Sequence, residues 1–281
     1  MKFGTFIRNT PPEEIAATAR QAEELGYDSL WTGDHVMPVI DHKPRYGNAP
    51  DGRFPTDEPW HDPMLTLTYA AAVTTKIKIA PGVLVVPLRN PFMTAKAVAS
   101  LDILSNGRFI FGIGIGWYEE EFAAIGAPFK DRALRTREYI ELMKVLWTED
   151  RPVYEGKTVS VKGVTFYPKP IQKPHPPIVV GGDSELAMKR TVRYGDGWYG
   201  IARSLDGARK LIAKLKEAQR VAGRTRPIEI TLSLRPGHLQ TLDEMKQLAE
   251  MGVDRVLAGL PTKALTQEQL TQFHDDVMAK F

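Results

Sequence analysis

The stretch Arg108-Phe109-Ile110-Phe111-Gly112-Ile113-Gly114-Ile115-Gly116-Trp117-Tyr118 combines an apolar run with three glycines spaced by two. Its β-branched and aromatic residues favour a buried strand, and the three acids that follow, residues 119–121, suit the first turn of a helix. Such a strand is typical of a ligand site, because a flat ring or a phosphate can approach a backbone that lacks Cβ atoms. The alternative is a buried strand whose glycines only make room for neighbouring side chains. The spacing does not fit the dinucleotide fingerprint G-x-G-x-x-G.

The same alternation of strand and helix runs through the rest of the chain. Each of eight predicted strands is followed by a helix, which favours a parallel sheet. Eight such units in about 250 residues indicate an α/β fold of the closed (β/α)₈ TIM-barrel type. The runner-up is an open, doubly wound sheet with a small second domain at residues 152–176. The predicted strands cover residues 2–7, 29–32, 77–86, 109–115, 177–180, 197–201, 228–234 and 253–258.

Two insertions interrupt this pattern. Residues 36–60, after the second strand, hold five prolines and no periodicity, and a loop of this length is usually functional or disordered. Residues 152–176, before the fifth strand, resemble a hairpin followed by a proline-rich arm. We find no repeat or linker that would split the chain, so we expect a single domain over residues 1–281.

Composition limits the classes of function. The 281 residues are 43% hydrophobic and 25% charged with a net charge of +3, which is ordinary for a soluble globular protein and too mild to indicate nucleic-acid binding. The absence of cysteine excludes disulfides, thiol catalysis and cysteine-bound zinc. No apolar run reaches the roughly 18 residues that a membrane span needs. We therefore expect a cytoplasmic protein with neither nucleic-acid nor membrane partners.

The active site of a TIM barrel lies in the loops after the carboxyl ends of its strands. These positions are rich in glycine and lack lysine, which argues against Schiff-base chemistry. The six histidines show no i, i+2 or i, i+4 pair for a metal, and no paired carboxylates favour glycoside hydrolysis. A bound organic cofactor is therefore expected to carry the reaction.

Gly181-Gly182-Asp183-Ser184 leads from a strand into the start of a helix, where free N–H groups and the helix dipole can bind phosphate. Alternatively, Asp183 or Ser184 simply caps the helix. The double glycine favours phosphate, whereas Asp183 and Glu185 would repel an anion.

Several motifs, in this order and spacing, resemble those of the luciferase-like monooxygenase superfamily over nearly the whole chain. They are Ala22 to Trp31 leading to Asp34-His35, Gly82 to Pro91, Leu101 to Arg108, Gly112 to Trp117 with Glu120-Glu121-Phe122, Lys169 to Ile178, Gly181-Gly182, and Tyr194 to Trp198. The form of the motifs is most similar to the branch that uses coenzyme F420, an 8-hydroxy-5-deazaflavin, although users of FMN share most of the pattern. In deazaflavin dehydrogenases of the superfamily, a glutamate often follows the glycine strand. This chain has Trp117 at that place.

The resemblance implies roles for particular residues. Asp34 and His35 are expected beside the cofactor ring as the catalytic pair, with His35 giving a proton or binding substrate. Gly82-Val83 is expected to support the ring from behind, across a non-proline cis peptide bond. Gly116 and Trp117 are expected to flank the ribityl chain, and Gly181, Gly182, Asp183 and Ser184 to hold the phosphate. A structural role for His35 is the alternative.

For the other candidate side chains, the chemistry allows more than one interpretation. Arg89 makes either a salt bridge with a nearby helix or a contact to cofactor or substrate, and Trp31 and Trp198 suit barrel packing better than substrate stacking. Glu229 and Arg255 lie early in neighbouring strands, so we expect them to pair if both point inward, because a lone buried charge is costly.

The leading functional hypothesis is an oxidoreductase that moves a hydride between reduced F420 and a small organic substrate. The second is an FMN-dependent monooxygenase supplied by a separate flavin reductase, and the third is a flavin-binding protein without catalysis. We expect no metal, a small-molecule substrate, a flavin or deazaflavin reductase as a candidate partner, and a homodimer.

Overall fold

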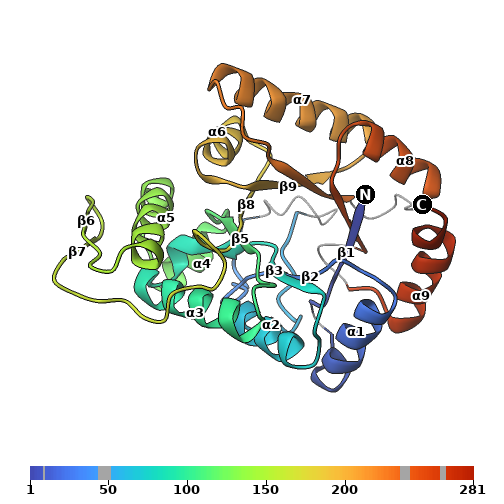
Figure 1. Cartoon of the computed structure of the whole chain (residues 1–281), viewed down its shortest axis with the longest axis horizontal. Coiled ribbons are helices and arrows are strands. Elements are labelled where there is room, and N and C mark those ends of the chain that lie inside the picture. The colour runs from blue at the N-terminus through green and yellow to red at the C-terminus, as the bar shows by residue number, and fades with distance from the viewer. Residues whose placement is uncertain (9, 44–51, 235–240, 260–263) are drawn as a thin grey trace.

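The structure is a computed structural model that describes residues 1–8, 10–43, 52–234, 241–259 and 264–281. Within these ranges, one nine-stranded parallel sheet forms the wall of a barrel in the order β3-β2-β1-β11-β10-β9-β8-β5-β4 (Figure 1). Its strands are β1 (Lys2–Phe6), β2 (Ser29–Thr32), β3 (Lys78–Pro81), β4 (Leu84–Val85), β5 (Phe111–Gly114), β8 (Ile178–Gly181), β9 (Gly197–Ala202), β10 (Glu229–Leu234) and β11 (Arg255–Ala258).

The two ends of this sheet, β3 and β4, are parts of one barrel strand. A cis peptide bond between Gly82 and Val83 separates them, as the family resemblance predicts. On the amino-terminal side of the break Ile79 bridges Phe109, and on the other side β4 pairs with β5. The barrel therefore closes with eight strands, and the open doubly wound alternative is wrong. The single strand predicted over residues 77–86 is corrected to two short strands and a turn.

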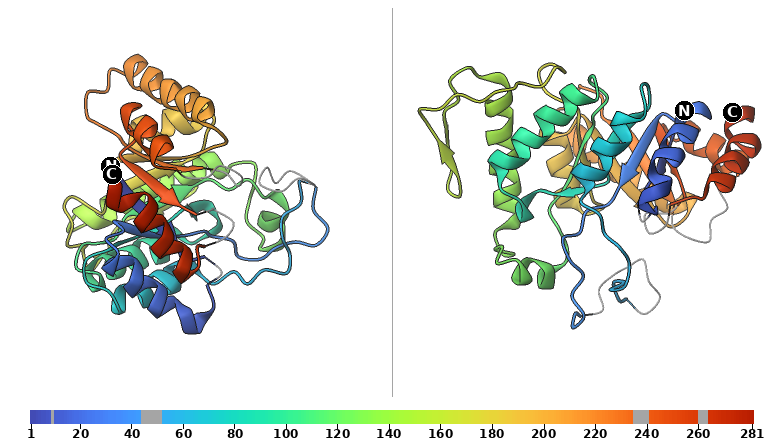
Figure 2. Two further views of the ribbon diagram at one scale, coloured as in Figure 1. Left: turned by 90° about the vertical axis from the view of Figure 1, so that its right-hand side faces the viewer. Right: turned by 90° about the horizontal axis from the view of Figure 1, so that it is seen from below.

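Most helices of the described ranges cover the outside of the barrel, and α4 (Glu119–Ala124) lies at one of its ends (Figure 2). In chain order, the helices are α1 (Pro12–Glu24), α2 (Pro63–Ala72), η1 (Val86–Leu88), α3 (Pro91–Leu104), α4, α5 (Arg132–Thr148), α6 (Glu185–Tyr194), α7 (Leu205–Val221), α8 (Leu242–Glu250), α9 (Gln267–Asp276) and η2 (Met278–Lys280). Their starts follow the sequence signals: the Asp62 carboxylate caps α2 ahead of Pro63, and Thr241 and Thr266 form capping boxes with residues three positions on.

Both predicted insertions are present. The described parts of the loop after β2, residues 36–43 and 52–60, contain no helix or strand. They project with α4 from one end of the barrel, while both chain termini lie at the other end (Figure 2). The insertion before β8 carries the hairpin β6 (Tyr154–Glu155) and β7 (Ser160–Val161), which extends away from the barrel (Figure 1).

Apolar side chains fill both the barrel and the layer between sheet and helices. Trp31 is fully buried inside the barrel, 5.7 Å from the ring of Tyr199. Trp198 is fully buried in the outer layer, and its indole N–H donates to the Gly182 carbonyl over 2.9 Å. Both tryptophans therefore pack the fold, as the sequence favoured.

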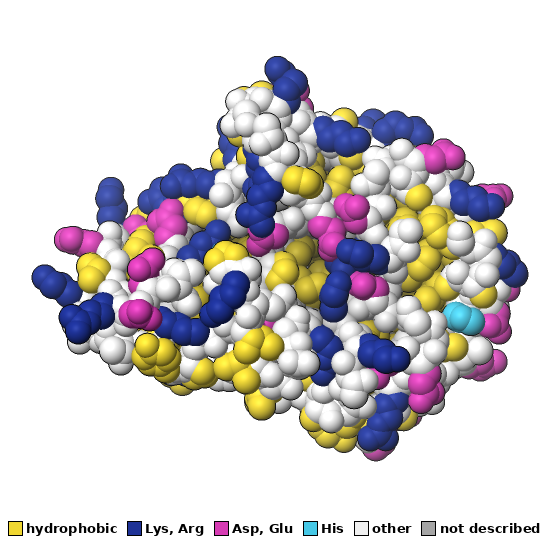
Figure 3. All heavy atoms as spheres, viewed as in Figure 1, with side chains coloured by type: hydrophobic (Ala, Val, Ile, Leu, Met, Phe, Trp, Pro, Cys, Tyr) yellow, Lys and Arg dark blue, Asp and Glu magenta, His cyan; other side chains and the backbone are white. Residues whose placement is uncertain are grey.

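The amino-terminal end of the barrel is closed by charged side chains. Arg255 is fully buried and pairs with Glu229, as predicted, and also with Asp28, whose Oδ2 lies 2.7 Å from Nη2. Figure 3 views this end, and acidic and basic side chains gather near its middle. The buried cation is thus neutralised by two carboxylates. The sequence predicts the pairing with Glu229 but not the one with Asp28.

Candidate active site

A cavity of about 320 Å³ opens at the carboxyl ends of the strands. Of the ten residues that the sequence nominates for the site, nine line it: Asp34, His35, Gly82, Val83, Gly116, Trp117, Gly181, Gly182 and Asp183. The tenth is Ser184. Its hydroxyl caps α6 and accepts a hydrogen bond from the Ala187 N–H over 3.2 Å. Parallel strands therefore bring four separate sequence segments to one place.

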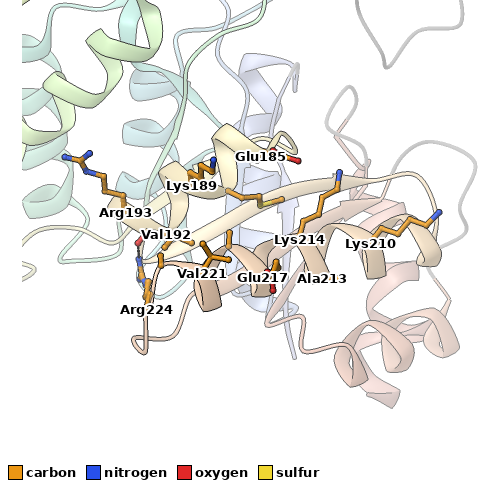
Figure 4. A pocket seen from close by; sticks show the side chains of 13 residues that line it. Glu185, Lys189, Val192, Arg193, Lys210, Ala213, Lys214, Glu217, Val221 and Arg224 are labelled. Atoms are coloured by element: carbon orange, nitrogen blue, oxygen red, sulfur yellow. Dashed lines mark hydrogen bonds between the residues drawn. The ribbon is translucent and has the colours of Figure 1, made fainter.

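Other cavities lie elsewhere in the described part of the chain. A groove of about 960 Å³ runs between α6 and α7 on the outside of the barrel (Figure 4). Its rim is made of solvated lysines such as Lys210 and Lys214, and none of the nominated residues reaches it. A cavity of about 280 Å³ lies at the charged end beside Arg255 and Glu229, and one of about 340 Å³ lies beside Arg8 and Glu58. The cavity at the barrel mouth is the candidate site, because the nominated residues line it. It is smaller than the groove between α6 and α7.

His35 lies at this mouth with its ring held from behind. Its side chain is 11% exposed, and Nδ1 lies 3.0 Å from Oε2 of Glu121, which is 1% exposed. The other Glu121 oxygen accepts from the backbone N–H groups of Val36, at 2.5 Å, and Met37, at 3.3 Å. Sequence reasoning missed this role for Glu121, because three adjacent acids all suit the first turn of a helix.

Aromatic side chains surround His35. Ring centroids lie 4.3 Å away for Phe54, 4.7 Å for Trp60, and 6.1 Å for both Trp117 and Tyr118. Phe54 and Trp60 belong to the long loop after β2, whereas Trp117 and Tyr118 follow β5. The loop and the glycine strand therefore build one aromatic enclosure that limits the access of water to His35.

Asp34 faces different partners from His35. Its buried carboxylate accepts from the Val85 N–H over 2.8 Å and from Arg89, whose Nη2 lies 2.7 Å from Oδ1. Arg89 also contacts Asp62 at 3.0 Å, at the start of α2, so the salt-bridge interpretation of Arg89 is confirmed. Burial alone would lower the pKa of Arg89, but the two carboxylates outweigh it and hold the pKa above its ordinary value.

The glycines of the opening stretch make room mainly for the protein itself. A Cβ at Gly112 would lie 1.9 Å from the Pro81 carbonyl oxygen, and one at Gly114 would lie 2.5 Å from the Val83 side chain. Val83 is also 2.8 Å from a Cβ built at Gly181, so it is wedged between two strands. This supports the interpretation that the glycines accommodate neighbours, and it leaves Val83 as an apolar surface in the cavity wall.

The turn before α6 offers less to a phosphate than its sequence indicates. The Gly182 N–H already donates to the Tyr199 carbonyl over 3.2 Å, and Gly182 has a φ of 118°, which few other residues tolerate. Asp183 lines the cavity with its acidic side chain. Any anion held here would use the N–H groups at the first turn of α6.

The model of the luciferase-like monooxygenase family matches residues 1–279. The chain belongs to this family. As a member it is an oxidoreductase, and the family resemblance of its motifs is confirmed. Within the described residues, no three His, Cys, Asp or Glu side chains come together as a metal site. None of the helices in the described ranges combines the length and hydrophobicity that crossing a membrane requires.

Individual relatives agree with this assignment. An F420-dependent glucose-6-phosphate dehydrogenase from Kineococcus radiotolerans is 33% identical over 279 residues, which cover 95% of this chain and 74% of the relative. An uncharacterized protein from Mycobacterium tuberculosis is 33% identical over 253 residues, covering 89% and 88%. The solved coenzyme F420-dependent tetrahydromethanopterin reductase from Methanopyrus kandleri matches with a TM-score of 0.78, at 20% identity and 100% and 99% coverage. At 20% identity, this last likeness shows a shared fold alone.

Proposed function

We propose that this oxidoreductase transfers a hydride between coenzyme F420 and a small organic substrate, with His35 as the proton donor or acceptor. One observation carries the proposal: His35 lies in an aromatic enclosure beside the apolar surface of Val83, in a single cavity at the barrel mouth. The curated relative named for F420 supports the choice of cofactor.

The cavity fits the ring of a deazaflavin. A volume of about 320 Å³ falls within the usual range of roughly 300–1,000 Å³ for small-molecule sites. Val83 would support one face of a flat ring, and the side chains of Trp117 and Trp60 would bound its edges. The polar tail has fewer evident partners. Lys43 and Arg53 of the long loop are candidates, whereas Arg45 lies outside the described residues.

When bound, the cofactor supplies or accepts the hydride at ring carbon five. The chain itself has three tasks: to orient the ring, to exclude water, and to move one proton. The substrate oxygen gains or loses that proton as the hydride moves, and an imidazole can exchange it near neutral pH. The ring nitrogen of His35 opposite Glu121, Nε2, would carry out this exchange.

We expect the protein to bind F420 at least about tenfold more tightly than FMN, a difference of roughly 1.4 kcal/mol. The motif form and the cationic side chains Lys43 and Arg53 favour the cofactor with the longer acidic tail. Titration of the apo-protein with each cofactor, followed by fluorescence, measures both dissociation constants. Riboflavin, which lacks phosphate, is the control for binding of the ring alone.

Equal or tighter binding of FMN would contradict this preference. It would instead favour the second candidate, an FMN-dependent monooxygenase, because the aromatic enclosure around His35 would also protect an oxygenation reaction from water. Failure of both cofactors to bind would reject the proposed function altogether.

We also propose that the chain forms a homodimer through α2 and α3. These neighbouring helices are apolar on their outer as well as their inner faces, and Leu65, Tyr69, Met93 and Leu104 are between 48% and 73% exposed. Hydrophobic side chains gather along the lower edge of Figure 3, over these helices. Contiguous apolar surface of this kind marks interaction sites.

We expect the double variant Leu65→Lys and Met93→Lys to be monomeric at concentrations where the unmodified chain is dimeric, because four lysines would be buried without partners in a symmetric interface. Light scattering coupled to size-exclusion chromatography measures the mass. Leu186→Lys, at a position on α6 that is 68% exposed, is the control and should leave the mass unchanged. An unmodified chain that elutes as a monomer would disprove the interface.

A further inference from the structure

We propose that Glu121 is a positioning residue that sets which nitrogen of His35 carries the proton, an inference that rests on the proposed function. In the sequence, this acid stands out only as part of a family motif at the start of a helix. In the structure it is 1% exposed and is the acceptor for the Nδ1 side of the His35 ring.

The hydrogen bonds around Glu121 fix their own directions. An ionised carboxylate only accepts, so the nitrogen 3.0 Å from Oε2 must donate, and the neutral ring then carries its proton on Nδ1. Oε1 is occupied by the N–H groups of Val36 and Met37, which cannot reverse their roles. His35 Nε2 is therefore left as an acceptor toward the cavity that His35 lines.

The residue next to His35 in the chain cannot perform this task. The Asp34 carboxylate is taken up by Arg89 and by the Val85 N–H, so it is already neutralised and oriented elsewhere. Two carboxylates in one cavity thus serve different partners. Glu121 directs the histidine, and Asp34, just after β2, binds Val85 of β4 and Arg89, which follows η1.

Glu121 also connects His35 to the long loop. The carboxylate that orients the His35 ring also accepts from the backbone N–H groups of Val36 and Met37, the two residues after His35 in the chain. Three residues earlier in the chain, the Tyr118 hydroxyl accepts from the Val39 N–H at 2.8 Å and donates to its carbonyl at 2.9 Å. Burial chiefly raises the pKa of Tyr118, which keeps this hydroxyl protonated. The start of the loop is thereby fixed against α4.

Glu121→Gln tests the assignment with almost no change in shape. The Val36 and Met37 N–H groups would hold the amide oxygen at the Oε1 position, which leaves the amide NH₂ facing His35 Nδ1. This NH₂ can only donate, so the neutral ring must move its proton to Nε2. We expect kcat for oxidation of an alcohol such as cyclohexanol by oxidised F420 to fall roughly a hundredfold, because Nε2 can no longer accept a proton.

Long-range proton–nitrogen correlation NMR of ¹⁵N-labelled protein reads the tautomer without cofactor or substrate. Signals of His35 are identified by their loss in His35→Gln. The neutral ring should carry its proton on Nδ1 in the unmodified chain and on Nε2 in Glu121→Gln. Glu119→Gln, which removes the same charge from an exposed position of α4, is the control and should change neither tautomer nor kcat.

The outcomes separate the two proposals. A proton on Nε2 in the unmodified chain overturns the role of Glu121, even if Glu121→Gln does not fold. A reversed tautomer with unchanged kcat overturns its role in catalysis while the proposed function stands. Absence of cofactor binding and turnover in the unmodified chain rejects the proposed function, and the NMR measurement still decides the hydrogen bond.

Discussion

His35→Ala is expected to lower turnover on the order of a hundredfold, the usual scale for losing a general acid or base. Hydride transfer to a carbonyl leaves an anion that needs a proton, and the ring of His35 lies at the cavity with its other side held by Glu121. Affinity for the cofactor should change only a few-fold, since Val83 and the strand ends remain in place.

Steady-state kinetics with F420 and a cofactor titration measure these two quantities. His274→Ala, on α9 away from the cavity, is the matched control for removal of an imidazole. Unchanged turnover would leave His35 with a structural role inside the aromatic enclosure. Turnover and cofactor affinity that fall together would instead place it in the cofactor pocket.

Arg255→Met is expected to lower the free energy of unfolding by about 3 kcal/mol, because it leaves two carboxylates at the barrel end without their shared cation. This is the lower end of the usual range, since the side chains of Asp28 and Glu229 are 22% and 30% exposed and each keeps a lysine nearby. Denaturant unfolding of both proteins measures this difference in unfolding free energy. The dependence of the free energy on denaturant concentration should be the same for both.

The ion pair between Arg255 and Glu229 makes stability depend on pH. Burial would raise the pKa of Glu229, but Arg255 and Lys2 outweigh it, so the pKa lies below its ordinary value of 4.5. A lowered pKa contributes stability that is complete above the unfolded value and is lost as pH falls through the folded one. The difference between Arg255→Met and the unmodified chain should therefore shrink below about pH 4.5.

Arg220→Met is the control for this variant. Arg220 pairs with Glu217 on the surface of α7, where the side chains are 72% and 57% exposed. Exposed pairs of this kind contribute little to stability because water screens them, so the unfolding free energy of this variant should stay near that of the unmodified chain. An Arg255→Met variant as stable as this control would show that water replaces the buried cation without cost.

The barrel and the place of its cavity could be predicted because both follow from local patterns. Strands such as residues 109–115 have a clear apolar character, and parallel strands necessarily bring their carboxyl ends together. The sequence thus placed nine of the ten candidate residues along one cavity. The pairing of Glu229 with Arg255 was predictable in the same way, from neighbouring strands and the cost of a lone buried charge.

The missed features depend on the rotation of short elements and on irregular backbone. Glu121 differs from Glu119 only in the direction it takes from the six-residue helix α4, which is too short to show a periodic apolar face. Phe54 and Trp60 reach His35 through a loop whose course no pattern encodes. Gly114 and Gly181 look like space for a ligand in the sequence, but the side chain of Val83, from another strand, occupies that space.

The shared hydrogen bonds of Glu121 have a consequence for redesign of this barrel. Loop exchange is the usual route to new substrates on such a scaffold, and residues 36–60 are the obvious segment to replace. A graft that begins at Val36 would disturb the carboxylate that also directs His35, so selectivity and rate would change together. Grafts that retain residues 34–39 and vary the segment from Phe54 onward would keep the proton-transfer group intact while reshaping the wall opposite Trp117.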